Sequence, residues 1–338
     1  FVMQQILRQP AKILTQAQRE AYFRDGFVGV EALIDQHWLQ RLNRVTSEFV
    51  EISRDYSAER KDKRFDLAPD HRSDSPRLRR LNSPVDHHEE YWAFASTGPF
   101  VDIAEDLLGP NVKFHHAKLN FKWAGGGEEV KWHQDIQFWP HTNYQVLTLG
   151  VYLDDVTQDM APMGIIPGSH NGPLYDLYDA EGNWTGNIRD TEVPQLGVET
   201  AVYLGGPAGS ITAHNCRCVH GSPANNSDKP RPLLLCAYSA AHTLPITDLT
   251  KGGKLAETIA RGDSGRGGTG AMWLRLRGRG FRLPAADNPS PGSRQPLVRA
   301  GRAGTDFFTK IYFWTGTRHR TLRFFSAHDP PILKKNIF

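Results

Sequence analysis

Residues 118–123 read Lys-Leu-Asn-Phe-Lys-Trp, and this alternation of polar and apolar side chains decides the fold. Successive side chains of an extended strand point to opposite faces, so Leu119, Phe121 and Trp123 would form an apolar face and the intervening residues a polar one. Short runs of the same kind, separated by Gly, Pro, Asn and Asp, continue along the chain and are typical of antiparallel strands. We predict further strands at 136–138, 146–153, 164–166, 200–204, 210–214 and 233–238.

The residues before this β-region show helical patterns. Thr15 and Gln18 have the spacing of a capping box, and Gly26 can end the helix that they begin. Asp35 can cap a second helix, and a third is predicted between Pro99 and Leu108. The apolar stripe of the second helix consists of Leu39, Leu42, Val45, Phe49 and Ile52.

The order of the predicted elements indicates the fold class. Residues 54–90 have little periodicity and predict a long loop with one strand-like piece at 78–81. Helices therefore come first along the chain, and strands follow. This order favours an α+β chain, mainly β, whose body is a β-sandwich or jelly roll with flanking N-terminal helices.

The composition is that of a soluble globular protein. Of the 338 residues, 39% are hydrophobic and 23% are charged, and no apolar run is long enough to span a bilayer. Residues 1–12 lack the apolar segment of a secretory signal, so we expect no membrane span and a cytoplasmic location. Cys216, Cys218 and Cys236 have no CxxC spacing, which disfavours a disulfide framework and a structural zinc site.

The last part of the chain differs in charge and composition. Residues 261–338 contain 15 Lys and Arg against 4 Asp and Glu, whereas residues 1–260 have a net charge of −8. Residues 261–304 contain ten Gly and nine Arg with almost no alternation, which is typical of a disordered segment. We predict one folded domain at 1–260 and a poorly ordered, Gly/Arg-rich tail at 261–338. The tail is compatible with a linker carrying a docking segment, a basic nucleic-acid-binding element or a reading-frame error in the gene.

A His-x-Asp pair lies at His133 and Asp135. In an extended segment, residues two apart point to the same side, so the imidazole and the carboxylate can converge on one point. The pair alone is a weak signal, because a polar surface pair at a strand end has the same form. A second segment, Val219-His220-Gly221-Ser222, supplies the third candidate ligand, His220.

Two histidines and one carboxylate are the ligands of Fe(II) in a facial triad, which leaves adjacent positions open for a bidentate 2-oxo acid and O₂. A zinc hydrolase would need a nearby general base, and neither an obvious base nor the HExxH spacing is present. Arg231 follows His220 by eleven residues, across a turn formed by residues 223–230, and can lie on the neighbouring strand. Its guanidinium can hold the distal carboxylate of 2-oxoglutarate through two parallel hydrogen bonds.

Four motifs together resemble the phytanoyl-CoA dioxygenase family. They are Trp-His-Gln-Asp at 132–135, Ile-Ile-Pro-Gly-Ser-His at 165–170, His-Gly-Ser at 220–222 and Lys-Pro-Arg at 229–231, and the resemblance extends over residues 15–260. It implies a double-stranded β-helix that uses Fe(II), 2-oxoglutarate and O₂ to hydroxylate a C–H bond of a small-molecule substrate, with release of succinate and CO₂. Halogenating relatives replace the triad carboxylate with a small residue, so the presence of Asp135 favours hydroxylation.

The resemblance also implies residues around the co-substrate. Ser222, Lys118 and Arg80 occupy positions near 2-oxoglutarate in the family, and Gln134 lies between the two ligands of the first motif. We therefore expect these four residues to bind the co-substrate together with Arg231. Relatives often have an apolar residue at the position of Lys118, so this contact departs from the family's pattern.

The loop after the first motif is rich in aromatic side chains, which suits the wall of a substrate site or ordinary core packing. The adjacent pairs His87-His88 and His115-His116 are not expected to bind a second metal, because neighbours in a strand face opposite ways. The candidates for a wall around an apolar or ring-bearing substrate are Phe138, Trp139, His141 and Tyr144.

Three interpretations of the function are open at this point. The main one is a 2-oxoglutarate dioxygenase, whose site would equally serve epoxidation, ring closure or demethylation. The second is a non-catalytic barrel-fold binding protein, which would require loss of metal affinity despite the intact triad. The third gives the basic tail an RNA-binding role through phosphate attraction and aromatic stacking. The sequence does not indicate an oligomeric state.

Overall fold

A computed structural model of the chain describes residues 2–125, 129–246, 253–263, 312–315 and 318–321. The chain divides into two compact units, residues 1–265 and residues 266–338. In the second unit, the strands β13 (Tyr312–Thr315) and β14 (Arg318–Thr321) form an antiparallel hairpin in which Tyr312 pairs with Thr321. Most of the tail predicted to be poorly ordered lies outside the described residues.

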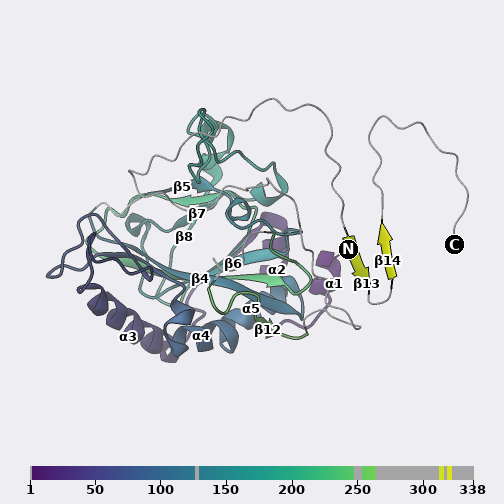
Figure 1. Ribbon diagram of the computed structural model, residues 1–338, viewed down its shortest axis with the longest axis horizontal. Helices are drawn as coiled ribbons and strands as arrows, with labels where there is room; N and C mark the ends of the chain where they lie inside the picture. The colour runs from purple at the N-terminus through teal and green to yellow at the C-terminus, as the bar shows by residue number, and fades with distance from the viewer. Residues whose placement is uncertain (1, 126–128, 247–252, 264–311, 316–317, 322–338) are drawn as a thin grey trace, which may run out of the picture. The chain divides into compact units, whose positions relative to one another are not determined.

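The first unit is built on two antiparallel sheets, which form the double-stranded β-helix that the resemblance implies. The larger sheet has the strand order β1-β9-β6-β11-β4-β3-β2, with β12 also paired to β4, and the smaller sheet has the order β5-β10-β7-β8. In Figure 1 the strands β5, β7 and β8 lie above β4 and β6 of the larger sheet. The bounds are β1 Phe27–Val30, β2 Phe65–Leu67, β3 Leu78–Asn82, β4 Val112–Lys122, β5 Val130–His133, β6 Val146–Tyr152, β7 Met163–Ile165, β8 Val202–Leu204, β9 Ile211–Asn215, β10 His220–Ser222, β11 Arg231–Ala240 and β12 Ile259–Arg261.

Helices cover the outer face of the larger sheet. The capping box of Thr15 and Gln18 is present, the helix that it begins ends at the left-handed Gly26, and Asp35 accepts a hydrogen bond from the backbone of Trp38. Figure 1 shows α3, α4 and α5 side by side below the strands. The bounds are α1 Val2–Leu7, α2 Gln16–Asp25, α3 Gln36–Ser53, α4 Glu89–Ser96 and α5 Pro99–Leu108.

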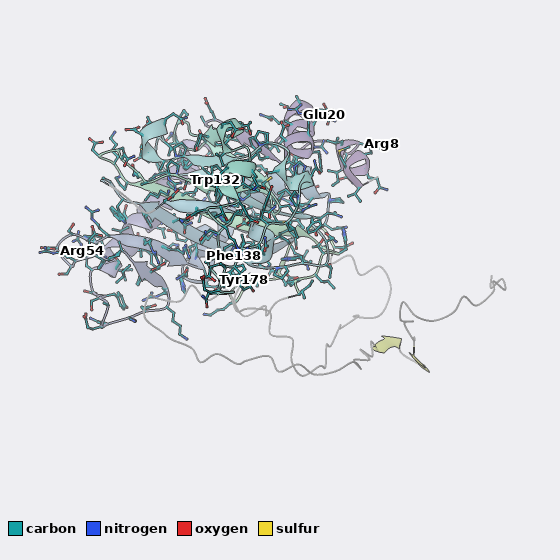
Figure 2. All side chains as sticks on the ribbon, turned by 90° about the horizontal axis from the view of Figure 1, so that it is seen from above. Arg8, Glu20, Arg54, Trp132, Phe138 and Tyr178 are labelled. Carbon is teal, nitrogen blue, oxygen red and sulfur yellow. The ribbon has the colours of Figure 1, made fainter. Side chains whose placement is uncertain are left out.

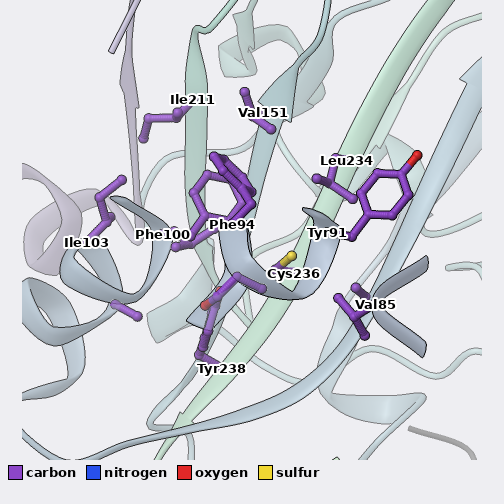
Figure 3. Packing of buried hydrophobic residues seen from close by; sticks show 14 of the residues in the cluster. Val85, Tyr91, Phe94, Phe100, Ile103, Val151, Ile211, Leu234, Cys236 and Tyr238 are labelled. Carbon is purple, nitrogen blue, oxygen red and sulfur yellow. The ribbon is translucent and has the colours of Figure 1, made fainter. Parts of the chain in front are cut away.

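The main hydrophobic core lies between these helices and the larger sheet. Figure 3 shows Phe94 and Phe100 from the helices facing Val151 and Leu234 from the strands, and all four are fully buried. Tyr238, also in the core, donates a hydrogen bond from its hydroxyl to the carbonyl oxygen of Ala95 at 2.7 Å. Aromatic burial and satisfied polar groups thus fix the larger sheet against the helices, so that its inner face can carry polar side chains.

Several predicted elements differ in the structure. The strand predicted at 136–138 is wrong, because Asp135–Gln137 form a 3-10 turn in which Ile136 is buried against Trp139. The apolar stripe of α3 stops at Phe49, since Ile52 is 40% exposed. The short helix α4 and the short strand β2 were missed. No helix in the described part of the chain is long and apolar enough to cross a membrane.

A β-bulge in β4 changes which residues face the inside of the barrel. Ala237 of β11 pairs with His116, but its neighbour Tyr238 pairs with Phe114, so His115 is an extra residue in β4. As a result the two histidines do not face opposite ways. Their Nδ1 atoms lie 2.6 Å apart, and the expectation that adjacent residues here diverge is wrong.

Candidate active site

Three potential metal ligands meet at one end of the smaller sheet. His133 is the last residue of β5, His220 is the first residue of β10, and the two are direct partners across these strands. Their ring centroids are 4.2 Å apart, and Oδ1 of Asp135 lies 3.8 Å from Nε2 of each imidazole. The three ligand atoms all lie within 4.8 Å of one another, so one ion can contact all of them.

Backbone carbonyl groups orient both imidazoles. Nδ1 of His133 lies 2.8 Å from the carbonyl oxygen of Lys131, and Nδ1 of His220 lies 3.0 Å from that of Cys218. A carbonyl oxygen can only accept, so each Nδ1 carries the proton and each Nε2 presents its lone pair toward Asp135. Burial lowers the pKa of both histidines, which keeps them neutral and able to bind a cation.

Asp135 is buried but charged. Burial would raise its pKa, but the hydrogen bond from His214 and the charge of Lys118 favour the ionised form, and the pKa is held well below its usual range. Thr148 donates a hydrogen bond from Oγ1 to Oδ2 at 2.9 Å, and His214 Nε2 lies 3.3 Å from the same oxygen. Oδ1 is therefore the carboxylate oxygen that is turned toward the two histidines.

The donor set fits a ferrous ion. Two imidazole nitrogens and one carboxylate oxygen on one side of an ion are the facial arrangement of non-haem Fe(II) oxygenases. Among the residues that the structure describes, this is the one group of three or more His, Cys, Asp or Glu side chains placed to hold a metal. The histidine pair at 115–116 does not form a second such group there, although the bulge brings the rings together.

Arg231 is a buried cation, and part of its guanidinium lacks a hydrogen-bond acceptor. It is the first residue of β11, pairs with Lys122 of β4 and is 3% exposed. Its Nε and Nη1 atoms are buried without a hydrogen-bond partner, while the guanidinium carbon lies 5.7 Å from the ring centre of Tyr152. Buried cationic donors without acceptors are costly. A carboxylate beside Arg231 would satisfy these donors, so the residue fits the distal end of 2-oxoglutarate.

Lys122 is a second cation beside Arg231, and it was not among the residues expected at the site. Its ammonium group donates hydrogen bonds to the carbonyl oxygens of Ser222, at 3.1 Å, and of Pro223. Burial, together with the neighbouring Arg231, lowers its pKa to about 7. The alternation at 118–123 already placed Lys122 on the polar face, and only its pairing with Arg231 was not visible in the sequence.

Three other residues were expected near the co-substrate, and they lie on three different strands. Ser222 is buried at the end of β10, where its carbonyl group contacts Lys122. Arg80 of β3 pairs with Asn120 of β4 and donates from Nε to its Oδ1 at 2.9 Å. Lys118 is half-buried two residues before Asn120, and its charge acts on Asp135. Arg80, Asn120 and Lys118 lie along one polar face of the larger sheet, whereas Ser222 belongs to the smaller sheet.

Gln134 is not brought to the metal ligands. Its side-chain amide donates to the carbonyl oxygens of Pro173, at 3.1 Å, and Arg217, at 2.8 Å, and accepts from the backbone N–H of Tyr175 at 3.0 Å. Between two residues that point toward the ion, the side chain of an extended residue must point away. Gln134 therefore holds the loop at 173–175, and its side chain is turned away from the metal ligands.

Phe138 lies beside the metal ligands. Its ring meets that of His133 edge-on at 5.6 Å and that of Trp184 at 5.3 Å, and Trp184 also contacts Tyr178. Figure 2 labels Phe138 and Tyr178, whose rings both contact Trp184. Phe138 thus connects the metal centre with the loop that carries Tyr178 and Trp184.

Of the other aromatic candidates, Trp139 and His141 are buried in one cluster with His115. Nδ1 of His141 lies 2.7 Å from the carbonyl oxygen of Trp139, and its Nε2 is buried without a hydrogen-bond partner. Tyr144 is not brought to this site, because its ring is 45% exposed and lies under the guanidinium of Arg217 at 4.5 Å.

Comparisons with known proteins give a family and several relatives. The family described as phytanoyl-CoA dioxygenase (PhyH) matches residues 22–233. A probable alpha-ketoglutarate-dependent hypophosphite dioxygenase from Stutzerimonas stutzeri is 35% identical over 179 residues, which cover 50% of this chain and 59% of that protein. An L-proline trans-4-hydroxylase from Streptomyces griseoviridis is 30% identical over 189 residues, which cover 51% of this chain and 70% of that protein.

A solved structure shows the same fold. The crystal structure of EctD from S. alaskensis with bound Fe has a TM-score of 0.57 at 21% identity, over 69% of this chain and 79% of that chain. The match to the hypophosphite dioxygenase spans less than two thirds of that relative's length. The family match covers more than half of the present sequence, and the chain therefore belongs to the phytanoyl-CoA dioxygenase family.

Proposed function

We propose that this protein is an Fe(II)- and 2-oxoglutarate-dependent dioxygenase that hydroxylates a small-molecule substrate. The observation that carries the proposal is the convergence of His133 Nε2, Asp135 Oδ1 and His220 Nε2 beside a buried guanidinium with unsatisfied donors. A metal site alone would suit many activities. The additional anion pocket at Arg231 favours a co-substrate that carries a second carboxylate.

Each residue of the site has a separate task. His133, Asp135 and His220 would hold the iron on one side, and Arg231 with Lys122 would hold the distal carboxylate of 2-oxoglutarate. Bound together, Fe(II), 2-oxoglutarate and O₂ supply the oxidising power, while 2-oxoglutarate is converted to succinate and CO₂. The protein's own contribution is to orient the reactants and to exclude water from the buried ligand side.

The names of the relatives support the reaction class but not one substrate. They include hypophosphite and L-proline, which differ in size and in charge. The substrate of this chain is therefore not transferred from a relative. Its chemical class has to come from the residues beyond the metal ligands.

Succinate formation tests the proposal. Purified protein supplied with Fe(II), 2-oxoglutarate and air is expected to release succinate slowly on its own and faster when a substrate is added. Succinate release should require Fe(II), 2-oxoglutarate and O₂, and it should be absent in Asp135→Ala. If a protein that binds Fe(II) released no succinate under any tested substrate mixture, the barrel would be a binding module and the proposal would be wrong.

A further inference from the structure

The inner face of β4 carries more polar side chains than one co-substrate can use. Leu119 and Phe121 belong to the main core, so Lys118, Asn120 and Lys122 share the opposite face. A strand rises about 3.3 Å per residue, so Lys118 and Lys122 are attached about 13 Å apart. Lys122 marks the end at which Arg231 lies, and Lys118 lies well beyond it along the strand.

The length of 2-oxoglutarate limits how far it can extend along this face. Its two carboxyl carbons are joined by four C–C bonds of about 1.5 Å, so they lie at most about 6 Å apart. A molecule whose distal carboxylate is at Arg231 therefore covers the part of the strand next to Lys122. The bulge extends the same inner face past Lys118 to His116 and His115.

The charges form two separate positive sites. Arg231 acts on Lys122, whereas the charge of Lys118 acts on Asp135, His133 and His116, and Arg80 acts on Lys118 and His116. Lys118 is half-buried, and its ammonium group has no hydrogen-bond or ion-pair partner among the residues that the structure describes. An ammonium group in this position is best satisfied by an external anion.

The two histidines of the bulge precede Lys118 on the same strand, and their rings contact each other and Trp139. The contact between their Nδ1 atoms uses one nitrogen of each ring, and within the described part of the chain neither Nε2 has a hydrogen-bond partner. The ring of Trp139 lies 5.4 Å from that of His115 and 5.6 Å from that of His116. Burial lowers the pKa of both histidines, that of His116 to about 3, so they offer hydrogen bonds without adding charge.

We propose that Lys118, His116 and His115 form a second anion subsite, which binds an oxyanionic group of the primary substrate against the indole of Trp139. The inference rests on the proposed function, and it assigns Lys118 to the primary substrate in place of the co-substrate contact that the family resemblance implies. The class of ligand is a small phosphonate, phosphinate or carboxylate. The ammonium group supplies the charge, one imidazole N–H supplies a directional donor, and the indole covers the apolar part.

Anaerobic calorimetry with a charged and an uncharged probe tests the subsite. The protein loaded with Fe(II) and 2-oxoglutarate is titrated with methylphosphonate, and in parallel with its uncharged dimethyl ester. Methylphosphonate is expected to bind and the ester is not. Lys118→Met should weaken methylphosphonate binding about 10- to 100-fold, His116→Leu should weaken it about tenfold, and 2-oxoglutarate affinity should be unchanged in both. Lys12→Met, at a lysine that is about half exposed on the surface, is the matched control and should bind both compounds like the unmodified chain.

Three results would overturn the inference. Equal binding of the ester and the anion would remove the charge argument. Unchanged methylphosphonate affinity in Lys118→Met would show that the lysine does not bind the anion. If Lys118→Met lost affinity for 2-oxoglutarate and not for methylphosphonate, Lys118 would belong to the co-substrate site. Because the readout is binding rather than turnover, these results differ from a failure of the proposed function, which appears as absent 2-oxoglutarate binding or absent succinate in the unmodified protein.

Discussion

Nε2 of His214 lies 3.3 Å from Oδ2 of Asp135, the carboxylate oxygen that is turned away from His133 and His220. Thr148 donates to the same oxygen at 2.9 Å. A carboxylate accepts and does not donate when ionised, so Nε2 of His214 carries the proton. These two donors fix the rotation of the carboxylate and leave Oδ1 for a metal ion.

We predict that His214→Phe lowers Fe(II) affinity about 10- to 100-fold, because partners of metal ligands typically contribute this much. His214→Gln keeps a donor near Oδ2 and should recover most of the affinity. The measurement is an anaerobic Fe(II) titration, with folding checked by circular dichroism. Equal affinities for His214→Phe and the unmodified protein would show that Thr148 alone is sufficient to orient the carboxylate.

Arg231→Met should weaken 2-oxoglutarate binding at least about 100-fold, because two charge-assisted hydrogen bonds in a buried pocket are lost. The same change should increase the free energy of unfolding of the protein without co-substrate, since the unpaired Nε and Nη1 atoms are removed from the interior. Calorimetric 2-oxoglutarate binding and thermal unfolding measure the two effects. A variant that lost stability and kept its co-substrate affinity would show that Arg231 has only a structural role.

The pH dependence of co-substrate binding should report Lys122. Its pKa is lowered to about 7, and a bound carboxylate favours the charged ammonium. Affinity for 2-oxoglutarate should therefore be constant below about pH 7 and fall by up to about tenfold per pH unit above it, until the raised pKa of the complex is reached.

Calorimetric titrations of the iron-loaded protein between about pH 6 and about pH 9 would measure this slope, and Lys122→Met should abolish it. The histidine ligands do not interfere in this range, because burial lowers the pKa values of His133 and His220. A slope that persisted in Lys122→Met would assign the titration to another group.

Gln134→Leu should reduce the free energy of unfolding by about 2 to 4 kcal/mol, because it leaves three backbone groups of the loop without their partners. Fe(II) affinity should change little, since the side chain points away from the ligands. Chemical denaturation and Fe(II) titration measure the two quantities. Gln195→Leu, at an exposed glutamine, is the control, and a selective loss of 2-oxoglutarate affinity in Gln134→Leu would restore its expected role as a co-substrate ligand.

Local patterns predicted much of the fold. The capping box at Thr15, the cap at Asp35 and the left-handed Gly26 are confirmed, because each depends on residues close in the sequence. The strand predicted at 136–138 failed, since burial of Ile136 in a 3-10 turn produces the same apolar spacing as a strand. The short helix α4 was missed within a region of little periodicity.

Contacts between distant strands set the limit of what the sequence could predict for the site. The spacing of His133 and Asp135 indicated a pair of ligands, and its partner His220 could be proposed from a motif. The positions of Lys122 and His214 could not be predicted, because they depend on the register of β4 with β11 and of β9 with β6. The bulge at His115 depends on the same register, and it reverses the direction that simple alternation gives that residue.

An anaerobic titration with Fe(II) in the presence of 2-oxoglutarate tests the account most directly. The protein is expected to bind one Fe(II) per chain and to show the visible absorption of an iron–2-oxo acid complex. His133→Ala, Asp135→Ala and His220→Ala should each lose both signals, whereas His37→Ala, at an exposed histidine of α3, should keep them. Stoichiometric Fe(II) binding that survived in all three triad variants would contradict the account.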